Sequence, residues 1–213
     1  MKQRHFRLAG LAAAALLAVS AAHADTLSVG NSSNVYVAED GKLATSLAQS
    51  STGFHTPTLW GVQNLTTGTS FLAYCIEQGQ SAVAASQTYT ASAYSAPSGV
   101  QELYDRFYDT SLKTQQGAVA FQLALWELTG GSTVSSFSFV QVTGAKDLAT
   151  SWLGTVAADN DPFAQKYTLT QWSNGAYQDV LQAVPVPEPE TYALMLAGLG
   201  AIGLIARRRK ASR

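Results

Sequence analysis

The chain has 213 residues, which is enough for one compact domain once its two unusual ends are set aside. Its net charge is −1, but residues 25–206 hold 5 Lys or Arg against 14 Asp or Glu, a net charge of −9. An acidic surface repels phosphate backbones, so a nucleic-acid partner is not expected. Cys75 is the only cysteine, which excludes an intramolecular disulfide.

The first 24 residues have the order of a secretory signal peptide. Basic residues stand among the first seven, an apolar run follows over residues 8–19, and Ala22-His23-Ala24 is an A-x-A cleavage site. We therefore expect the secretion translocon to export the chain and signal peptidase to remove residues 1–24. The mature protein would begin at Asp25.

Residues 25–184 are predicted to form the exported domain, an α+β fold with a mainly antiparallel β framework and two or three short inserted helices. Strand-favouring segments separated by turn residues are 34–38, 58–63, 70–77, 88–94, 137–142 and 166–172. The predicted helices are 100–109, with Ser98 as its N-cap, 114–128, ended by Gly130-Gly131, and a weaker one over 147–153.

Two residues of this domain invite a chemical interpretation. Gln122 shares the apolar face of the second predicted helix with Val119, Leu125 and Trp126. A glutamine there is costly unless its carboxamide is hydrogen-bonded or chemically consumed. Cys75 lies in an apolar strand, where a thiol is usually inert core filling. Taken singly, both residues favour structural roles.

Taken together, their surroundings resemble the paired motifs of thioester-forming adhesin domains. Tyr74-Cys75-Ile76-Glu77 is similar to the aromatic-Cys-aliphatic-acid strand of that family, and Phe121-Gln122-Leu123-Ala124-Leu125-Trp126 to its T-Q-x-A-aliphatic-Trp (TQXA) pattern. The resemblance implies an internal thioester in which Cys75 supplies the sulfur and Gln122 the acyl group, with loss of ammonia. Phe121 departs from the pattern, and the short spacing from Cys75 to Gln122 suggests a reduced version of the fold.

The resemblance also suggests assisting residues. Tyr74 and Trp126 would keep water away from the thioester, and Glu77 would position or deprotonate a reacting group, although an exposed carboxylate at a strand end is the commoner situation. His55 is the only histidine after residue 24. One Cys and one His are too few to ligate a zinc ion, so we expect no metal and no cofactor. No family pattern around these two residues supports a Cys/His protease.

The C-terminal residues 185–213 have a three-part order. Pro187-Glu188-Pro189 interrupts any preceding element, the uncharged run 191–206 predicts a single transmembrane helix, and the basic residues of 207–213 favour an inside C-terminus. A buried core helix is the alternative for the apolar run. The order resembles the PEP-CTERM sorting signal of exopolysaccharide-producing Gram-negative bacteria. That resemblance implies processing by an exosortase and delivery to the cell surface or the extracellular matrix.

The sequence therefore predicts an exported surface or matrix protein that is not an enzyme. Its membrane-anchored precursor would be processed by the exosortase, and its domain would attach covalently to an amine or hydroxyl group on a surface polymer. The alternative is a non-reactive structural or carbohydrate-binding protein of an exopolysaccharide biofilm matrix. A secreted hydrolase ranks below both, because no convergent acid and base residues stand out.

Overall fold

A six-stranded closed barrel forms the centre of the computed structural model, which describes residues 22–29, 35–81, 86–158, 164–187, 195–200 and 202. Around the barrel the strands follow the order β1-β4-β5-β9-β8-β6, and every neighbouring pair is antiparallel. The strands are β1 (His23–Ser28), β4 (Leu59–Asn64), β5 (Ser70–Cys75), β6 (Gln87–Ala93), β8 (Tyr167–Asn174) and β9 (Tyr177–Pro185).

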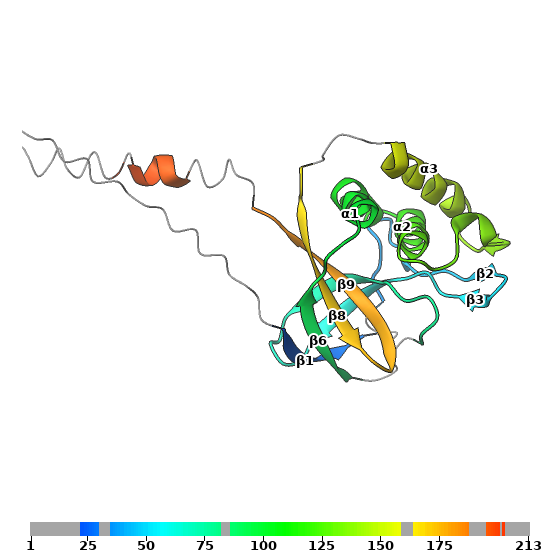
Figure 1. Ribbon diagram of the computed structural model, residues 1–213, viewed down its shortest axis with the longest axis horizontal. Helices are drawn as coiled ribbons and strands as arrows, with labels where there is room; N and C mark the ends of the chain where they lie inside the picture. The colour runs from blue at the N-terminus through cyan, green and yellow to red at the C-terminus, as the bar shows by residue number, and fades with distance from the viewer. Residues whose placement is uncertain are drawn as a thin grey trace, which may run out of the picture.

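Three helices lie on one side of the barrel, and a small second sheet lies beside α2 and α3 (Figure 1). The helices are α1 (Ser98–Ser111), α2 (Gln115–Leu128) and α3 (Ala145–Ala158), with a 3₁₀ turn at Val134–Ser136. The small sheet has the order β3-β2-β7, and its antiparallel strands are β2 (Ala48–Ser50), β3 (Gly53–His55) and β7 (Phe139–Val140).

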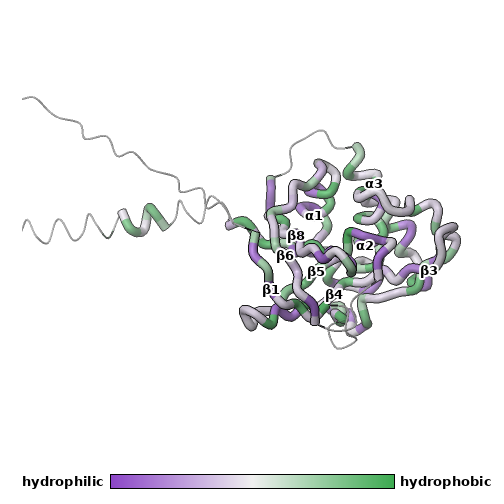
Figure 2. Tube along the Cα trace, turned by 60° about the horizontal axis from the view of Figure 1, so that its bottom comes forward, coloured by the Kyte–Doolittle hydropathy of each residue, from purple (hydrophilic) through white to green (hydrophobic). Residues whose placement is uncertain are grey.

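The barrel wall separates two hydrophobic cores, and β5 contributes to both. Ala73 and Cys75 belong to the cluster inside the barrel, whereas Tyr74 belongs to the larger cluster between the barrel and the helices. This division follows from the period of two in a strand, which sends successive side chains to opposite faces. Figure 2 shows hydrophobic stretches on the helices and on the barrel strands.

Helix α2 is the central helix of the layer. Its N-cap Thr114 accepts a hydrogen bond from the backbone N–H of Gly117, and every residue from 117 to 126 is buried. A helix that is hydrophobic all round is expected in a fully enclosed position. Gly130, with φ of +88°, follows the C-cap residue Thr129, as the predicted glycine stop requires.

The predicted fold class is confirmed in its main part, because the structure is mainly antiparallel β with a few helices. All three predicted helices are present, and α3 is longer than 147–153. Four strands were not predicted: β1, β2, β3 and β9. In the predicted segment 34–38, the described residues 35–38 form only isolated bridges, at Val35 and Val37. The N-cap of α1 is Pro97 and not Ser98, which is the first residue of the helix.

The two ends of the chain lie largely outside the described residues. Strand β1 includes His23 and Ala24, so cleavage at the predicted site would leave Asp25–Ser28 of that strand. Of the run 191–206, only residues 195–200 and 202 are described, and they are helical. No helix in the described part of the chain is long and apolar enough to cross a membrane. The predicted transmembrane helix is therefore not confirmed.

Candidate functional site at Cys75 and Gln122

The two residues singled out by the sequence are in direct contact in the structure. Cys75 is the last residue of β5, and Gln122 lies in the middle of α2. The Cys75 backbone N–H donates to Gln122 Oε1 at 3.0 Å, and Gln122 Nε2 donates to the Cys75 carbonyl oxygen at 2.7 Å. Both residues are buried, with exposed fractions of 3% and 0%.

Strand β4 ends before it reaches Cys75, and this explains why the Cys75 backbone can form hydrogen bonds with a side chain. Strand β4 pairs with β5 only as far as Leu59 opposite Tyr74, while β9 continues on the other side with Val180 opposite Cys75. The backbone edge of Cys75 that β4 leaves open is filled by the Gln122 carboxamide. The amide thereby satisfies its own buried polar atoms and those of the strand.

The Cys75 thiol makes its own contact inside the barrel. The indole N–H of Trp60 donates to Sγ at 3.1 Å, and both residues belong to the barrel cluster. Burial, with a smaller contribution from the Glu77 charge, raises the pKa of the Cys75 thiol to about 12, and the Trp60 hydrogen bond opposes that rise. The thiol is therefore protonated at neutral pH. Sequence reasoning did not identify Trp60, because no local motif links it to a strand 15 residues away.

Tyr74 and Trp126 are buried, but they lie in the larger core between barrel and helices, whereas the thiol lies in the barrel cluster. Tyr74 stacks on Phe121 at a centroid distance of 4.5 Å, and its hydroxyl donates to Ser111 Oγ. The residue that contacts the thiol is Trp60. Tyr74 and Trp126 instead pack in the core between the barrel and α2, the helix that carries Gln122.

Glu77 lies two residues beyond Cys75 and is half-buried. Its Oε2 accepts a hydrogen bond from the backbone N–H of Asp179 at 3.1 Å, and its backbone carbonyl accepts one from Gln178 Nε2. These contacts hold the end of β5 against β9. Glu77 therefore has a structural task, and its charge lies close enough to Cys75 to disfavour a thiolate.

His55, the remaining candidate side chain, belongs to the small sheet. Its Nε2 lies 3.0 Å from Ser50 Oγ and 3.1 Å from Thr52 Oγ1, and its ring packs edge-on against Trp126 and Phe137. Among the described residues, no hydrogen bond joins His55 to Cys75. The arrangement offers no support for a Cys/His pair.

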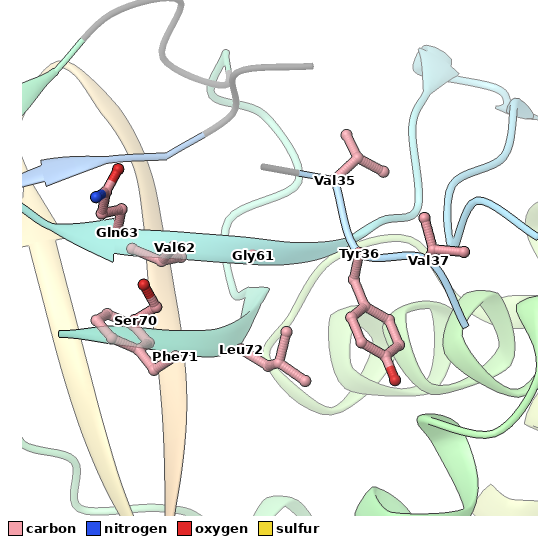
Figure 3. A pocket seen from close by; sticks show the side chains of 9 residues that line it. All are labelled: Val35, Tyr36, Val37, Gly61, Val62, Gln63, Ser70, Phe71 and Leu72. Carbon is pink, nitrogen blue, oxygen red and sulfur yellow. The ribbon is translucent and has the colours of Figure 1, made fainter. Parts of the chain in front are cut away.

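A cavity of about 1030 Å³ adjoins the site. Its lining includes the segment from Ile76 to Ser81 that follows Cys75, the segment from Thr129 to Thr133 that follows α2, and Phe54 and His55 of β3. A second cavity, of about 620 Å³, lies over the first half of β5 and over β4 (Figure 3). That cavity contains none of the predicted site residues, and the Tyr36 hydroxyl at its edge donates to the Leu112 carbonyl oxygen.

The sorting motif begins where the barrel ends. Strand β9 ends at Pro185, and the N–H of Val186 donates to the Lys166 carbonyl oxygen at 2.7 Å. Pro187 is exposed, and Glu188 and Pro189 lie outside the described residues. The motif therefore starts two residues beyond the last strand of the domain.

Comparison with solved structures returns N-terminal domains of bacterial surface proteins, several of which are described as thioester domains. The N-terminal thioester domain of a surface protein from Clostridium perfringens is 14% identical, with a TM-score of 0.44, over 61% of this chain and 89% of that chain. The N-terminal domain of the Streptococcus pyogenes pilus tip adhesin Cpa is 16% identical, with a TM-score of 0.41, over 61% and 85%. The N-terminal thioester domain of the Streptococcus pyogenes fibronectin-binding protein SfbI is 13% identical, with a TM-score of 0.42, over 72% and 98%.

No curated protein matches this sequence. A family model described as the PEP-CTERM protein-sorting motif matches residues 185–210, which confirms the predicted PEP-CTERM sorting signal. The motif implies processing by an exosortase. The chain is thus an exported protein that carries a PEP-CTERM protein-sorting motif in residues 185–210.

Proposed function

We propose that this chain is a covalent surface adhesin, in which Cys75 and Gln122 form an internal thioester that captures an amine or hydroxyl group on a surface polymer. The observation that carries the proposal is the reciprocal pair of hydrogen bonds between the Gln122 carboxamide and the Cys75 backbone. The pair brings together two residues 47 positions apart, each within a motif that resembles the thioester adhesins.

Formation of the bond requires no cofactor. Cys75 Sγ adds to Gln122 Cδ, the C–N bond breaks, and ammonia leaves with the thiol proton. Because the Cys75 N–H already donates to Oε1, it would stabilise the negative charge that develops on that oxygen during addition. The thiol exchanges its contact with Trp60 for the amide carbon in this step.

The attack on the finished bond is a single event. An amine adds to the thioester carbonyl, the C–S bond breaks, and the amine proton passes to sulfur, which leaves a new amide and a free thiol. A hydroxyl group would give an ester in the same way. Since the thioester is consumed, the protein would react once and would not turn over as an enzyme does.

The sorting motif supports a route to the surface. We infer that the signal peptide is removed at Ala24 and that residues 191–213 hold the precursor in the membrane of a Gram-negative cell. Exosortase processing near Pro187-Glu188-Pro189 would then release the domain to the cell surface or to an exopolysaccharide matrix. The basic residues of 207–213 favour the inside orientation that this route needs.

The mass of the purified full chain tests the thioester. We expect the chain to be lighter than its calculated mass by one ammonia, and peptide mapping should join the peptides that contain Cys75 and Gln122. Methylamine should restore a free thiol and leave a methylamide on Gln122. The variants Cys75→Ala and Gln122→Ala should lack the mass loss and the adduct, whereas the exposed helix residue Gln116, changed to Ala, should retain both.

A full calculated mass with an unmodified Gln122 would contradict the proposal. The thiol would then be a buried core group bound to Trp60, and the reciprocal amide contacts would be structural. That outcome would favour a non-reactive protein of a biofilm matrix, exported by the same signals.

A further inference from the structure

The small sheet presents a row of side chains that the Cys75 site does not use. Gln49 of β2 lies opposite Phe54 of β3 on one side and opposite Phe139 of β7 on the other. Residues directly opposite each other in a sheet point to the same face. Phe54 is 66% exposed and Phe139 48% exposed, and Gln49 is exposed between them.

The opposite face of the same sheet is packed against the molecule. Ala48 and Ser50, the neighbours of Gln49 in β2, are buried, with exposed fractions of 0% and 6%. The sheet therefore has one inner face and one outer face. The outer face carries the ring of Phe54 on β3 and the ring of Phe139 on β7. Because neighbouring strands are about 4.8 Å apart, the two phenylalanines stand about 10 Å apart across Gln49.

The outer face carries no charge. The three strands contain no Lys, Arg, Asp or Glu, and burial lowers the pKa of their one titratable side chain, His55, so that it is neutral at pH 7. These strands supply no charged side chain to pair with a phosphate, a sulfate, a carboxylate or an ammonium group. Two aromatic rings that flank a carboxamide are suited to a ligand with C–H faces and hydroxyl groups, because a ring face is electron-rich and an amide both donates and accepts.

The cavity beside the Cys75 site continues this surface. Phe54 is part of its lining, and most of the other lining residues carry hydroxyl or carboxamide groups or are glycines. Gln78 Nε2 and Gln80 Oε1 are buried, and neither has a hydrogen-bond partner among the described residues. A buried unpaired donor and acceptor are costly, and rotation of these two side chains toward the cavity that they line would let hydroxyl groups of a ligand satisfy both. Glu77 is the only charged residue in the described lining.

We propose that the outer face of β3-β2-β7 binds a neutral polysaccharide, whose sugar rings stack on Phe54 and Phe139, whose hydroxyl groups bond to Gln49, and whose chain continues into the cavity lined by Gln78 and Gln80. This binding is reversible and does not need the thioester. It would bring the hydroxyl groups of the polymer close to Cys75 and Gln122 if the proposed covalent function also holds.

Affinity electrophoresis of the full chain in detergent tests the proposal, with gels that contain a neutral polymer (dextran, mannan, galactan or xylan) or a charged one (a polyuronate or a sulfated polysaccharide). The Cys75→Ala chain is used throughout, so that a failure of the thioester does not affect the result. We expect at least one neutral polymer to retard the chain. The double variant Phe54→Ala and Phe139→Ala should bind at least about tenfold more weakly, as the loss of two ring contacts predicts.

The matched control is Leu65→Ala, because Leu65 is an exposed hydrophobic residue in the turn between β4 and β5. It should leave the retardation unchanged, and Phe54→Tyr should retain binding because a stacking ring is kept. The proposal would be overturned if none of the neutral polymers retards the chain or if only polyuronate or sulfated polymers do. It would also fail if the double variant binds normally, or if it only abolishes self-association, which would make this face an interface between copies.

Discussion

At the scale of single residues, the Gln122 carboxamide is the feature on which the site depends. A buried glutamine in the middle of a helix requires partners, and the structure supplies both of them from one residue, Cys75. The carboxamide bonds to the backbone N–H and C=O of Cys75 as a neighbouring strand would, at the place where β4 stops pairing with β5. The same contacts explain why a buried amide is stable in the middle of this helix.

These hydrogen bonds can be measured apart from any thioester. In a Cys75→Ala chain, Gln122→Leu keeps the side-chain volume but leaves the backbone N–H and C=O of residue 75 without their partner. We expect the free energy of unfolding to fall by about 2 to 4 kcal/mol, measured by urea unfolding. Gln116→Leu, at an exposed position of the same helix, should change it by less than about 0.5 kcal/mol. Equal effects of the two changes would mean that the Gln122 contacts contribute little.

At the scale of elements, the packing of α1 against α2 depends on a close backbone approach. A Cβ atom on Gly117 would lie 3.1 Å from the carbonyl oxygen of Thr110 and 3.2 Å from Cα of Ser111. Both are backbone atoms at the end of α1, so this end of the helix and the turn that follows it would have to shift by a few tenths of an ångström. This turn also sets the start of α2, and therefore the depth at which Gln122 meets β5.

A pair of glycine substitutions tests this close approach. Gly117→Ala should destabilise the protein by about 1 to 3 kcal/mol, because overpacking exceeds the gain in helix propensity. Gly154→Ala in α3, where a Cβ would have open space, should stabilise it by about 0.5 to 1 kcal/mol. Thermal unfolding of both variants measures the difference. A stabilising Gly117→Ala would show that the turn is free to adjust.

At the scale of the whole molecule, the folded domain and the sorting signal are adjacent but separable. The last barrel strand ends at Pro185, and the family match covers residues 185–210. Of the residues after Val186, those that the structure describes are exposed and lie outside the core. Changes in the motif should alter the fate of the chain without altering the fold of the domain.

Replacement of Pro187, Glu188 and Pro189 by alanine tests this separation in cells that contain an exosortase. The unprocessed chain should accumulate, detected as a larger band in the cell fraction, while its resistance to proteolysis stays that of the wild type. Leu65→Ala, at an exposed position between β4 and β5 and outside the matched residues 185–210, provides the control and should be processed normally. Normal processing of the altered motif would contradict the assigned role of these three residues.

The sequence by itself determined the PEP-CTERM motif, the mainly antiparallel fold with a few helices, and the pair Cys75 and Gln122 as neighbours, because each depends on local patterns. It could also have predicted β9, since Asn174-Gly175 between two strand-like segments is a strong hairpin signal. Only the tertiary structure decided that Trp60 contacts the thiol, that the Gln122 amide completes the edge of β5, and that Phe54 and Phe139 flank Gln49. These contacts join strands and helices that are distant in the chain, and strand register, which no local pattern specifies, sets which side chains meet.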